Sequence, residues 1–166
     1  MNKRWIKYAY ACVALCIVEP VASAPCADDE GPRGAVEAYI TAMSQYLFND
    51  AWEFVSENMT DSRSRDEWVG LQNMFYKGGE VTIFGMDIRQ AHATDDDPAC
   101  EKWATVPNIL KSRDKFNNQG TTEFEYYVTV KDGDVWKVDS QETLFTEEAI
   151  KEWFPDDEIP AFRDAY

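Results

Sequence analysis

The stretch EFEYYVTVKDGDVWKVDS, residues 123–140, determines more of the fold than any other part of the chain. Apolar side chains recur at every second position over residues 124–130, which is the period of a strand with one buried face. Asp132-Gly133 is a preferred two-residue turn between antiparallel strands, and a second apolar run follows it. The stretch therefore predicts a β-hairpin, in which Trp136 lies buried under the helices on the same face as Val138.

Two further strands are predicted before this hairpin. From Val81 to Ile88 the apolar residues keep a spacing of two but change parity at Gly85, which predicts a bulge or a sharp bend there. Residues 103–111 form the second predicted strand, and Pro107 is expected to confine it to a sheet edge or a bulge. With the hairpin, the sheet has about four antiparallel strands.

Three amphipathic helices are predicted before the sheet. The first spans residues 32–49, and Asp50 is expected to cap a second, short helix. Ser64 and Glu67 have the capping-box spacing that starts a third helix, which Gly78-Gly79 ends. The apolar stripes of the three helices are Val36, Tyr39, Ile40, Met43, Tyr46 and Leu47; Trp52, Val55 and Met59; and Trp68, Leu71 and Phe75.

A fourth, short helix is predicted after the hairpin. Thr146 can cap it, and Pro155 is expected to end it. Phe145 and Ile150 have the spacing of a hydrophobic staple across its first turn. The full order of elements predicts an α+β fold, with three N-terminal helices packed on one face of a bent antiparallel sheet.

On these elements the chain resembles the NTF2-like superfamily. The resemblance rests on the first helix, on the Ser64-x-x-Glu67-Trp68 helix start and on the hairpin around residues 132–139, and it covers about residues 33–145. It implies a cone-shaped domain whose helices and sheet enclose a pocket. Enzymes that resemble this fold, such as steroid isomerases and polyketide cyclases, place an Asp general base inside an apolar cone.

The first residues of the chain have the pattern of an export signal. Basic residues precede an apolar run over residues 8–18 that is too short to span a bilayer as a helix. Ala22-Ser23-Ala24 has the small-x-small pattern of a signal peptidase site, with cleavage expected after Ser23 or Ala24. We therefore expect a signal peptide over residues 1–24 and a single exported domain over residues 25–166, periplasmic or secreted. A short N-terminal membrane anchor is the alternative.

Charge and cysteine content agree with export and exclude one class of partner. The chain holds 16 Lys and Arg against 31 Asp and Glu, and loss of the signal leaves a net charge near −17, so a nucleic acid would be repelled. Cys26 and Cys100 remain as an even pair in an oxidising compartment, which predicts a disulfide. Two free thiols or a metal site are the alternatives. With His92 as the single histidine, the ligand set for zinc is poor.

The sequence carries no catalytic motif, so no catalytic residue, metal or cofactor is assigned. Four carboxylates lie in or next to predicted strands, where most are expected on the solvated face; they are Asp87, Glu123, Glu125 and Asp139. Of these, Asp139 is the preferred candidate for a buried acid, because it lies near Trp136 in the hairpin. The acidic run 95–97 lacks the spacing of a calcium loop.

Aromatic residues make up 14% of the chain, enough to line a pocket for an apolar or planar ligand. The candidate binding residues are Trp68, Phe84, Trp103, Tyr126 and Trp136. The alternative is that these side chains fill the core.

Three functions remain open from the sequence. The first is a non-enzymatic module that binds a small molecule or a protein. The second is an isomerase or cyclase with a buried carboxylate. The third is an acidic protein that neutralises a basic partner, for which the charge favours fast association. After signal removal no stable membrane span is expected.

Overall fold

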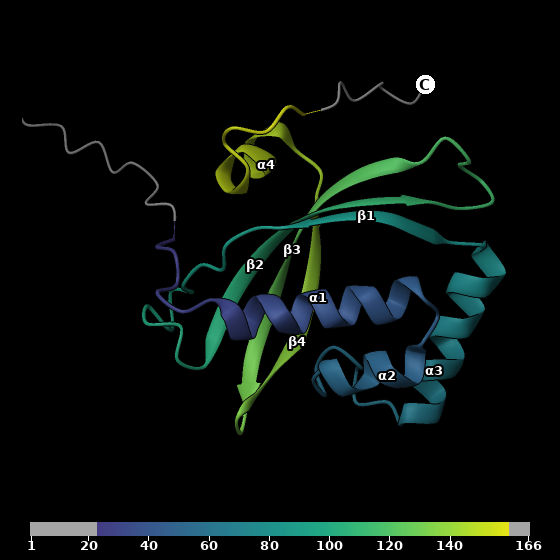
Figure 1. Cartoon of the computed structure of the whole chain (residues 1–166), viewed down its shortest axis with the longest axis horizontal. Helices are drawn as coiled ribbons and strands as arrows, with labels where there is room; N and C mark the ends of the chain where they lie inside the picture. The colour runs from purple at the N-terminus through teal and green to yellow at the C-terminus, as the bar shows by residue number, and fades with distance from the viewer. Residues whose placement is uncertain (1–22, 160–166) are drawn as a thin grey trace, which may run out of the picture.

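The computed structural model describes residues 23–159 (Figure 1). The predicted signal peptide, apart from its last two residues, lies outside the described residues, as do Cys12 and Cys16. Within the described range, no helix has the length and apolar composition needed to cross a membrane.

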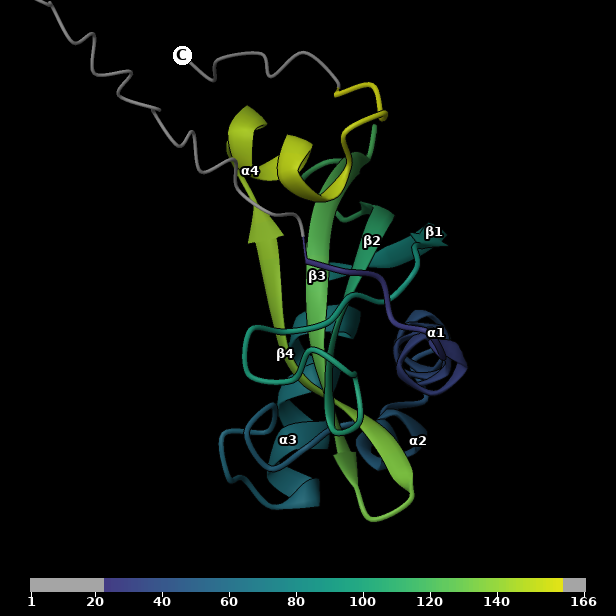
Figure 2. The same ribbon diagram turned by 90° about the vertical axis from the view of Figure 1, so that its left-hand side faces the viewer.

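Residues 23–159 form four helices and one four-stranded sheet, which confirms the α+β class. The sheet is antiparallel throughout, with the strand order β1-β2-β3-β4. Helix α1 lies across one face of the sheet, and α4 lies at the opposite end of the sheet from α2 and α3 (Figures 1 and 2). The elements are α1 Glu30–Ser44, α2 Phe48–Ala51, the 3₁₀ turn η1 Trp52–Phe54, α3 Arg65–Gln72, the π-helical turn η2 Asn73–Lys77, β1 Thr82–Ile88, β2 Trp103–Arg113, β3 Thr121–Asp132, β4 Val135–Leu144 and α4 Glu147–Trp153.

The hairpin of β3 and β4 is confirmed. Asp132 pairs with Val135, and Gly133 has a φ of 63°, a conformation that glycine adopts without strain. The register between the strands shifts at Asp139, which is the extra residue of a β-bulge in β4.

The two faces of the sheet belong to two separate cores. The larger core lies between α1 and the sheet, and it receives Tyr127 and Val138 from the hairpin. The smaller core lies under α4, and Phe124 belongs to it. Because side chains alternate along β3, Glu125 lies on the α1 side together with Tyr127, and Glu125 has no exposed surface. The expectation that strand carboxylates face solvent is wrong for Glu125.

The first two strands bear out one expectation and correct another. The predicted bulge is present, because the register shifts between Ile83 and Gly85. The expectation for Pro107 is wrong, since β2 is an inner strand between β1 and β3. The Pro107 carbonyl accepts a hydrogen bond from the Arg89 N–H at 2.9 Å, so its missing N–H lies on the side where β1 has already ended.

The first helix is shorter than the apolar stripe predicts. Helix α1 ends at Ser44, Tyr46 has a φ of 58°, and Leu47 is exposed. Asp50 lies inside α2 and caps nothing, which corrects the second helix start. The chain turns here because the Leu47 N–H donates to the Ala42 carbonyl at 2.9 Å, which ends the regular helical pattern.

The other two helix starts are confirmed, and one detail is corrected. The Ser64 N–H donates to the Glu67 carboxylate at 3.0 Å in the capping box of α3, and Thr146 accepts the Ala149 N–H at the start of α4. No staple closes the first turn of α4, because Phe145 is 77% exposed whereas Ile150 is fully buried.

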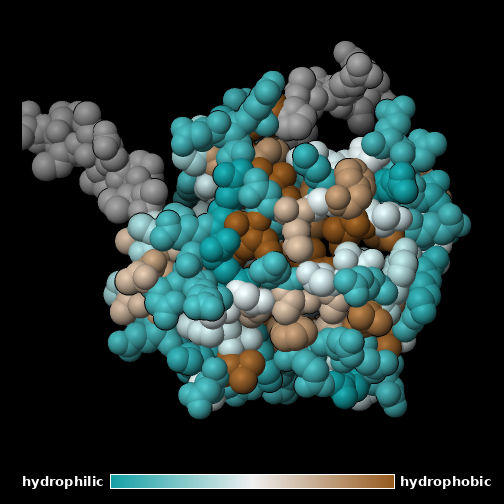
Figure 3. Space-filling view, in the orientation of Figure 1, coloured by the Kyte–Doolittle hydropathy of each residue, from teal (hydrophilic) through white to brown (hydrophobic). Residues whose placement is uncertain are grey.

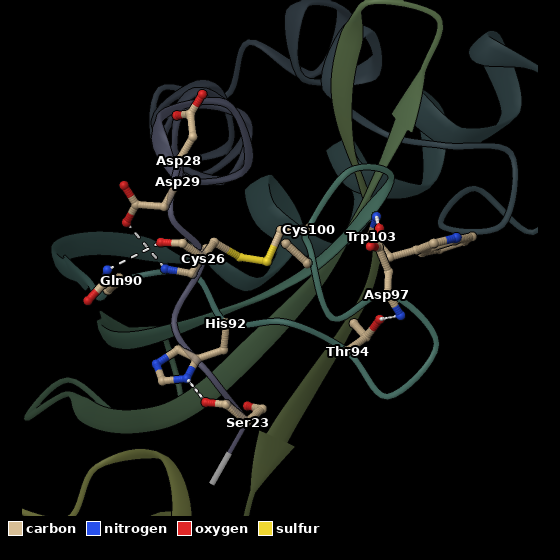
Figure 4. Close-up of a disulfide and its surroundings, with 12 residues drawn as sticks. Ser23, Cys26, Asp28, Asp29, Gln90, His92, Thr94, Asp97, Cys100 and Trp103 are labelled. Carbon is tan, nitrogen blue, oxygen red and sulfur yellow. Dashed lines mark hydrogen bonds between the residues drawn. A yellow bond between two sulfur atoms is a disulfide. The ribbon is translucent and has the colours of Figure 1, made fainter.

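The disulfide between Cys26 and Cys100 is present, as the cysteine count predicts. It ties the N-terminal segment to the connection between β1 and β2 (Figure 4). Backbone hydrogen bonds continue this attachment, since the Cys26 N–H donates to Ala91 and the Ala93 N–H donates to Ala24, both at 2.8 Å.

Candidate functional site

A cluster of polar side chains lies inside the larger core, and we call it the buried polar centre. Its members are Glu125, Asn108, Tyr127 and Gln141. Asn108 Nδ2 and the Tyr127 hydroxyl both donate to Glu125 Oε1, at 2.8 and 2.6 Å. Gln141 Nε2 donates to Glu125 Oε2 at 2.6 Å. Both carboxylate oxygens of Glu125 therefore have partners from three adjacent strands.

Strand register brings these four side chains together. Asn108 in β2 is the direct cross-strand partner of Glu125 in β3, and Gln141 in β4 is the partner of Tyr127. Glu125 and Tyr127 are two residues apart, so they lie on the same face of β3. Asn108 Oδ1 also accepts the Asp87 N–H at 3.1 Å, which links the centre to β1.

Burial dominates the electrostatics of the centre. It raises the pKa of Glu125 above its usual value, against the hydrogen bonds from Tyr127, Asn108 and Gln141, which favour the charged form. Burial also raises the pKa of Tyr127 well above 10 and raises the pKa of Tyr76 to about 12. The Tyr127 hydroxyl therefore stays protonated and acts as a donor to Glu125.

Access to the centre is closed. Asn108 and Glu125 have no exposed surface, and Tyr127 is 2% exposed. Tyr39 of α1 packs edge-on against the Tyr127 ring, with 6.2 Å between the ring centroids. Gln141 is exposed and forms the one direct link from Glu125 toward solvent within the hydrogen-bond network of the described residues.

Three grooves on the described residues are lined by other side chains. One of about 410 Å³ lies on the α4 side of the sheet, between Met86, Phe124 and Asp157. Another of about 620 Å³ lies along the outer side of α1, next to Leu47 and Phe54. A third of about 700 Å³ lies at the end of the sheet, where Lys77, Glu80, Thr82, Arg113, Asp114 and Lys115 line it together with Tyr46 and Asn118.

Comparison with solved structures identifies the architecture. Among known proteins, no family model and no curated sequence matches the chain. A domain of unknown function with a cystatin-like fold from Nostoc punctiforme superposes with a TM-score of 0.53 at 14% identity, covering 78% of this chain and 84% of that one. This chain has the cystatin-like fold. It is the cone-shaped architecture that the resemblance to NTF2-like proteins implies, so that expectation is confirmed for the fold.

Two other solved structures are similar at lower scores. A ketosteroid isomerase-like protein from Erwinia carotovora gives a TM-score of 0.48 at 17% identity, over 69% of this chain and 94% of that one. A Bdellovibrio bacteriovorus protein gives 0.48 at 13% identity, over 66% of this chain, and the match spans 38% of that protein's length. At such identities the likeness concerns the fold alone.

The five aromatic residues proposed from the sequence lie apart in this cystatin-like fold. Trp68 is buried and packs edge-on against Trp52, with 5.8 Å between the ring centroids. Tyr126 lies on the opposite face of the sheet, donates to Glu142 at 2.6 Å and contacts Trp153 of α4. Phe84 is exposed on the bulge of β1. The structure does not bring these side chains into one pocket.

The remaining two aromatic candidates are half-buried. Trp136 packs against Gly31 in the first turn of α1, so it lies beside the helices as expected but keeps part of its surface exposed. The Trp103 N–H donates to the carboxylate of Asp97 at 2.9 Å. No groove described above is lined by either residue.

The other carboxylates proposed from the sequence have surface or structural positions. Asp139 accepts hydrogen bonds from the Ser56 hydroxyl at 2.6 Å and from Asn58 Nδ2 at 3.0 Å, so it holds the segment after η1 against the bulge of β4. Asp87 forms an ion pair with Arg89 at 2.9 Å. Glu123 is half-buried, and burial followed by the charge of Asp114 raises its pKa.

The last polar candidates belong to the connection between β1 and β2. His92 lies at a hydrogen-bond distance of 2.7 Å from the Ser23 carbonyl (Figure 4). Its ring also packs edge-on against Trp153. Asp97, the last of the acidic run, accepts the N–H groups of Lys102 and Trp103, and these bonds lower its pKa. Both side chains therefore hold this connection in place.

Sequence reasoning did not single out Asn108, Tyr127 or Gln141. All three bind Glu125, which lies 17 residues from Asn108, 16 from Gln141 and two from Tyr127 along the chain. No local motif marks such pairs. The Glu-x-Tyr spacing of Glu125 and Tyr127 was the one available signal, because it places both side chains on one strand face.

Proposed function

We propose that the chain is a non-enzymatic binding module whose partner docks on the outside of the cone. One observation carries this proposal: Glu125, the single carboxylate that residues 23–159 bury inside the cone, has no exposed surface, and both of its oxygens are occupied. A general base must come within hydrogen-bond distance of the proton that it removes. A substrate cannot approach Glu125 in this arrangement.

The charge of the chain supports a protein partner. A net charge of −15 on 166 residues favours rapid association with a basic protein, which would meet acidic surface over most orientations. Apolar side chains also gather in the middle of one face, between the levels of α1 and α4, with hydrophilic residues around them (Figure 3). An apolar centre with a polar rim is typical of protein interfaces.

Export to the periplasm or to the medium is part of this proposal. The Cys26–Cys100 disulfide and the lack of a membrane-spanning helix in residues 23–159 are compatible with export. The signal pattern of residues 1–24 supplies the route.

A second candidate function is an isomerase or cyclase. It is favoured by the raised pKa of Glu125 and by the protonated hydroxyl of Tyr127 beside it, which together resemble a base and a hydrogen-bond donor. This function requires Gln141 to leave Glu125 Oε2 and a substrate to take its place.

Carbon-13 NMR of the Glu side chains distinguishes the two functions. The probe for the enzyme is a β,γ-unsaturated steroid ketone, and the probe for the binding module is oligolysine. We expect the ketone to leave the Glu125 carboxyl resonance unchanged and to remain unconverted, while oligolysine shifts surface carboxylates only. A shifted Glu125 resonance, with conversion that is lost in Glu125→Gln, would overturn the binding-module proposal.

A further inference from the structure

Three segments meet at the end of the molecule that holds η2, and we call this surface the basic–aromatic end. It consists of Lys77, Phe84, Arg113, Lys115 and Phe116. The Lys115 N–H donates to the Gly79 carbonyl at 2.9 Å and its ammonium group donates to the Gly78 carbonyl, so the β2–β3 loop is tied to the end of η2. Both segments lie at the right-hand end of the view in Figure 1.

In the groove at this end three cations face two acids, whereas acids far outnumber cations in the chain as a whole. Lys77, Arg113 and Lys115 line one groove, and no carboxylate of the described residues lies within ion-pair distance of any of them. Glu80 and Asp114 are the acids of the same groove. Of the other cations in residues 23–159, Arg33, Arg63, Arg65, Arg89 and Lys137 are paired with carboxylates, whereas Lys102, Lys111, Lys131 and Lys151 are not.

Two phenylalanines project from the same surface. Phe116 is 85% exposed at the tip of the β2–β3 loop, and Phe84 is 57% exposed beside Gly120 of that loop. Asp114 Oδ1 accepts the N–H groups of Phe116 and Asn117, at 2.7 and 2.8 Å, so the tip is held in a defined turn. Phe116 on the tip, with the Lys115 ammonium group 5.1 Å from its ring centroid, and Phe84 in β1 therefore offer two exposed rings for contact with another apolar medium.

We propose that the basic–aromatic end docks on an anionic lipid surface. The inference rests on the proposed binding function and names one partner of it. Aromatic rings of membrane-binding proteins insert at the boundary between head groups and acyl chains, and nearby Lys and Arg side chains are attracted to anionic head groups. A protruding Phe116 suits a soft bilayer, because a protein partner would need a pocket matched to it. The acidic remainder of the chain sets the orientation, since repulsion turns it away from the membrane.

Vesicle co-sedimentation with the full chain tests this inference. Vesicles of phosphatidylcholine alone are compared with vesicles in which about one third of the lipid is phosphatidylglycerol. We expect binding to the anionic vesicles only, released by salt, because attraction between exposed charges is screened. Phe116→Ser and the double variant Lys77→Glu/Arg113→Glu should each lower the bound fraction by about tenfold.

Matched variants control for loss of apolar surface and of charge. Phe145→Ser removes a ring of similar exposure that lies between β4 and α4, and Lys102→Glu reverses a cation before β2. Both should bind as the unmodified chain does, and circular dichroism shows that each variant is folded. The inference is overturned if anionic vesicles fail to bind at low salt, if Phe116→Ser and Phe145→Ser bind equally, or if an acidic protein, rather than lipid, binds this end.

The outcomes separate this inference from the proposed function. If vesicles do not bind and the Glu125 resonance stays unchanged with the ketone, the lipid inference fails and the binding module stands. If the Glu125 resonance shifts with turnover, the proposed function fails whatever the vesicles do.

Discussion

At the scale of single residues, Glu125 carries the most information about this protein. Its carboxylate is fully buried and receives hydrogen bonds from Asn108, Tyr127 and Gln141. A buried ionisable group costs stability unless its partners offset the lost hydration. The raised pKa of Glu125 shows that burial outweighs the three hydrogen bonds.

The raised pKa predicts how stability depends on pH. Below the ordinary pKa of Glu, about 4.3, the residue is protonated in the folded and the unfolded chain, and its contribution to stability is fully present. That contribution is lost as pH rises through the higher pKa of the folded state, because the folded protein must then ionise a buried group. We expect Glu125→Gln to remove this loss, so that its unfolding free energy rises relative to the unmodified chain as pH increases.

Urea unfolding followed by tryptophan fluorescence, from about pH 4 to about pH 8, measures the effect. Glu37→Gln, on the exposed side of α1, is the control and should follow the pH dependence of the unmodified chain. If the free energy of unfolding depends on pH in the same way for Glu125→Gln and the unmodified chain, the pKa of Glu125 is not changed by folding and the prediction is wrong.

At the scale of elements, the contact between α1 and β4 depends on a glycine. A Cβ placed on Gly31 would come within 2.4 Å of Trp136 Cδ1, a distance at which one element must shift. Gly34, one turn later in α1, has no heavy atom within 4 Å of such a Cβ. The first turn of α1 therefore approaches the Trp136 ring as closely as it does because residue 31 lacks a side chain.

This pair of glycines gives a prediction with opposite signs. Gly31→Ala should lower the free energy of unfolding by about 1–3 kcal/mol, because overpacking outweighs the better helix propensity of Ala. Gly34→Ala should raise it by about 0.5–1 kcal/mol, because there only the propensity changes. Chemical denaturation of both variants measures the difference. In a chain that already carries Trp136→Leu, adding Gly31→Ala should not lower the free energy of unfolding further. Two variants of equal stability would contradict the described contact.

At the scale of the whole molecule, one covalent link joins distant parts of the chain. The Cys26–Cys100 disulfide closes a sequence separation of 74 residues and attaches the N-terminal segment before α1 to the connection that precedes β2. Within the sheet, each strand pairs only with strands that are its neighbours in the sequence, because strand order follows sequence order. The disulfide is thus one of the long-range links outside the sheet, together with the contact between the segment after η1 and β4, where the Ser56 N–H donates to the Val138 carbonyl at 2.9 Å.

Loss of this link should lower the stability of the whole domain. In the chain-entropy account, a closed loop of this length contributes about 4 kcal/mol by restricting the unfolded chain. We expect Cys26→Ser/Cys100→Ser to lose about that much in urea unfolding, and the unmodified chain to lose it in the presence of reductant. Intact mass after alkylation reports the state of the thiols. Two alkylated thiols in protein taken without reductant from its native compartment would contradict the bridge.

The sequence by itself determined the features that depend on neighbouring residues or on simple counts. The Asp132-Gly133 turn, the capping residues Ser64 and Thr146, and the bulge at Gly85 are local signals, and each is present in the structure. The cysteine pair followed from counting, and the α+β class followed from the order of periodic segments. The apolar period also placed Val36, Tyr39, Ile40 and Met43 in the core.

Only the tertiary structure decided the features that depend on register between distant strands. The pairing of Asn108 with Glu125 placed a carboxylate in the core. The alternation along β3 predicts the reverse, with Phe124 and Tyr126 buried and Glu125 facing solvent. The end of β1 at Ile88 made room for Pro107 in an inner strand. The predicted aromatic pocket is dispersed for the same reason. Side-chain parity fixes a face of one strand, but the neighbour that covers that face comes from elsewhere in the chain, and no local signal records it.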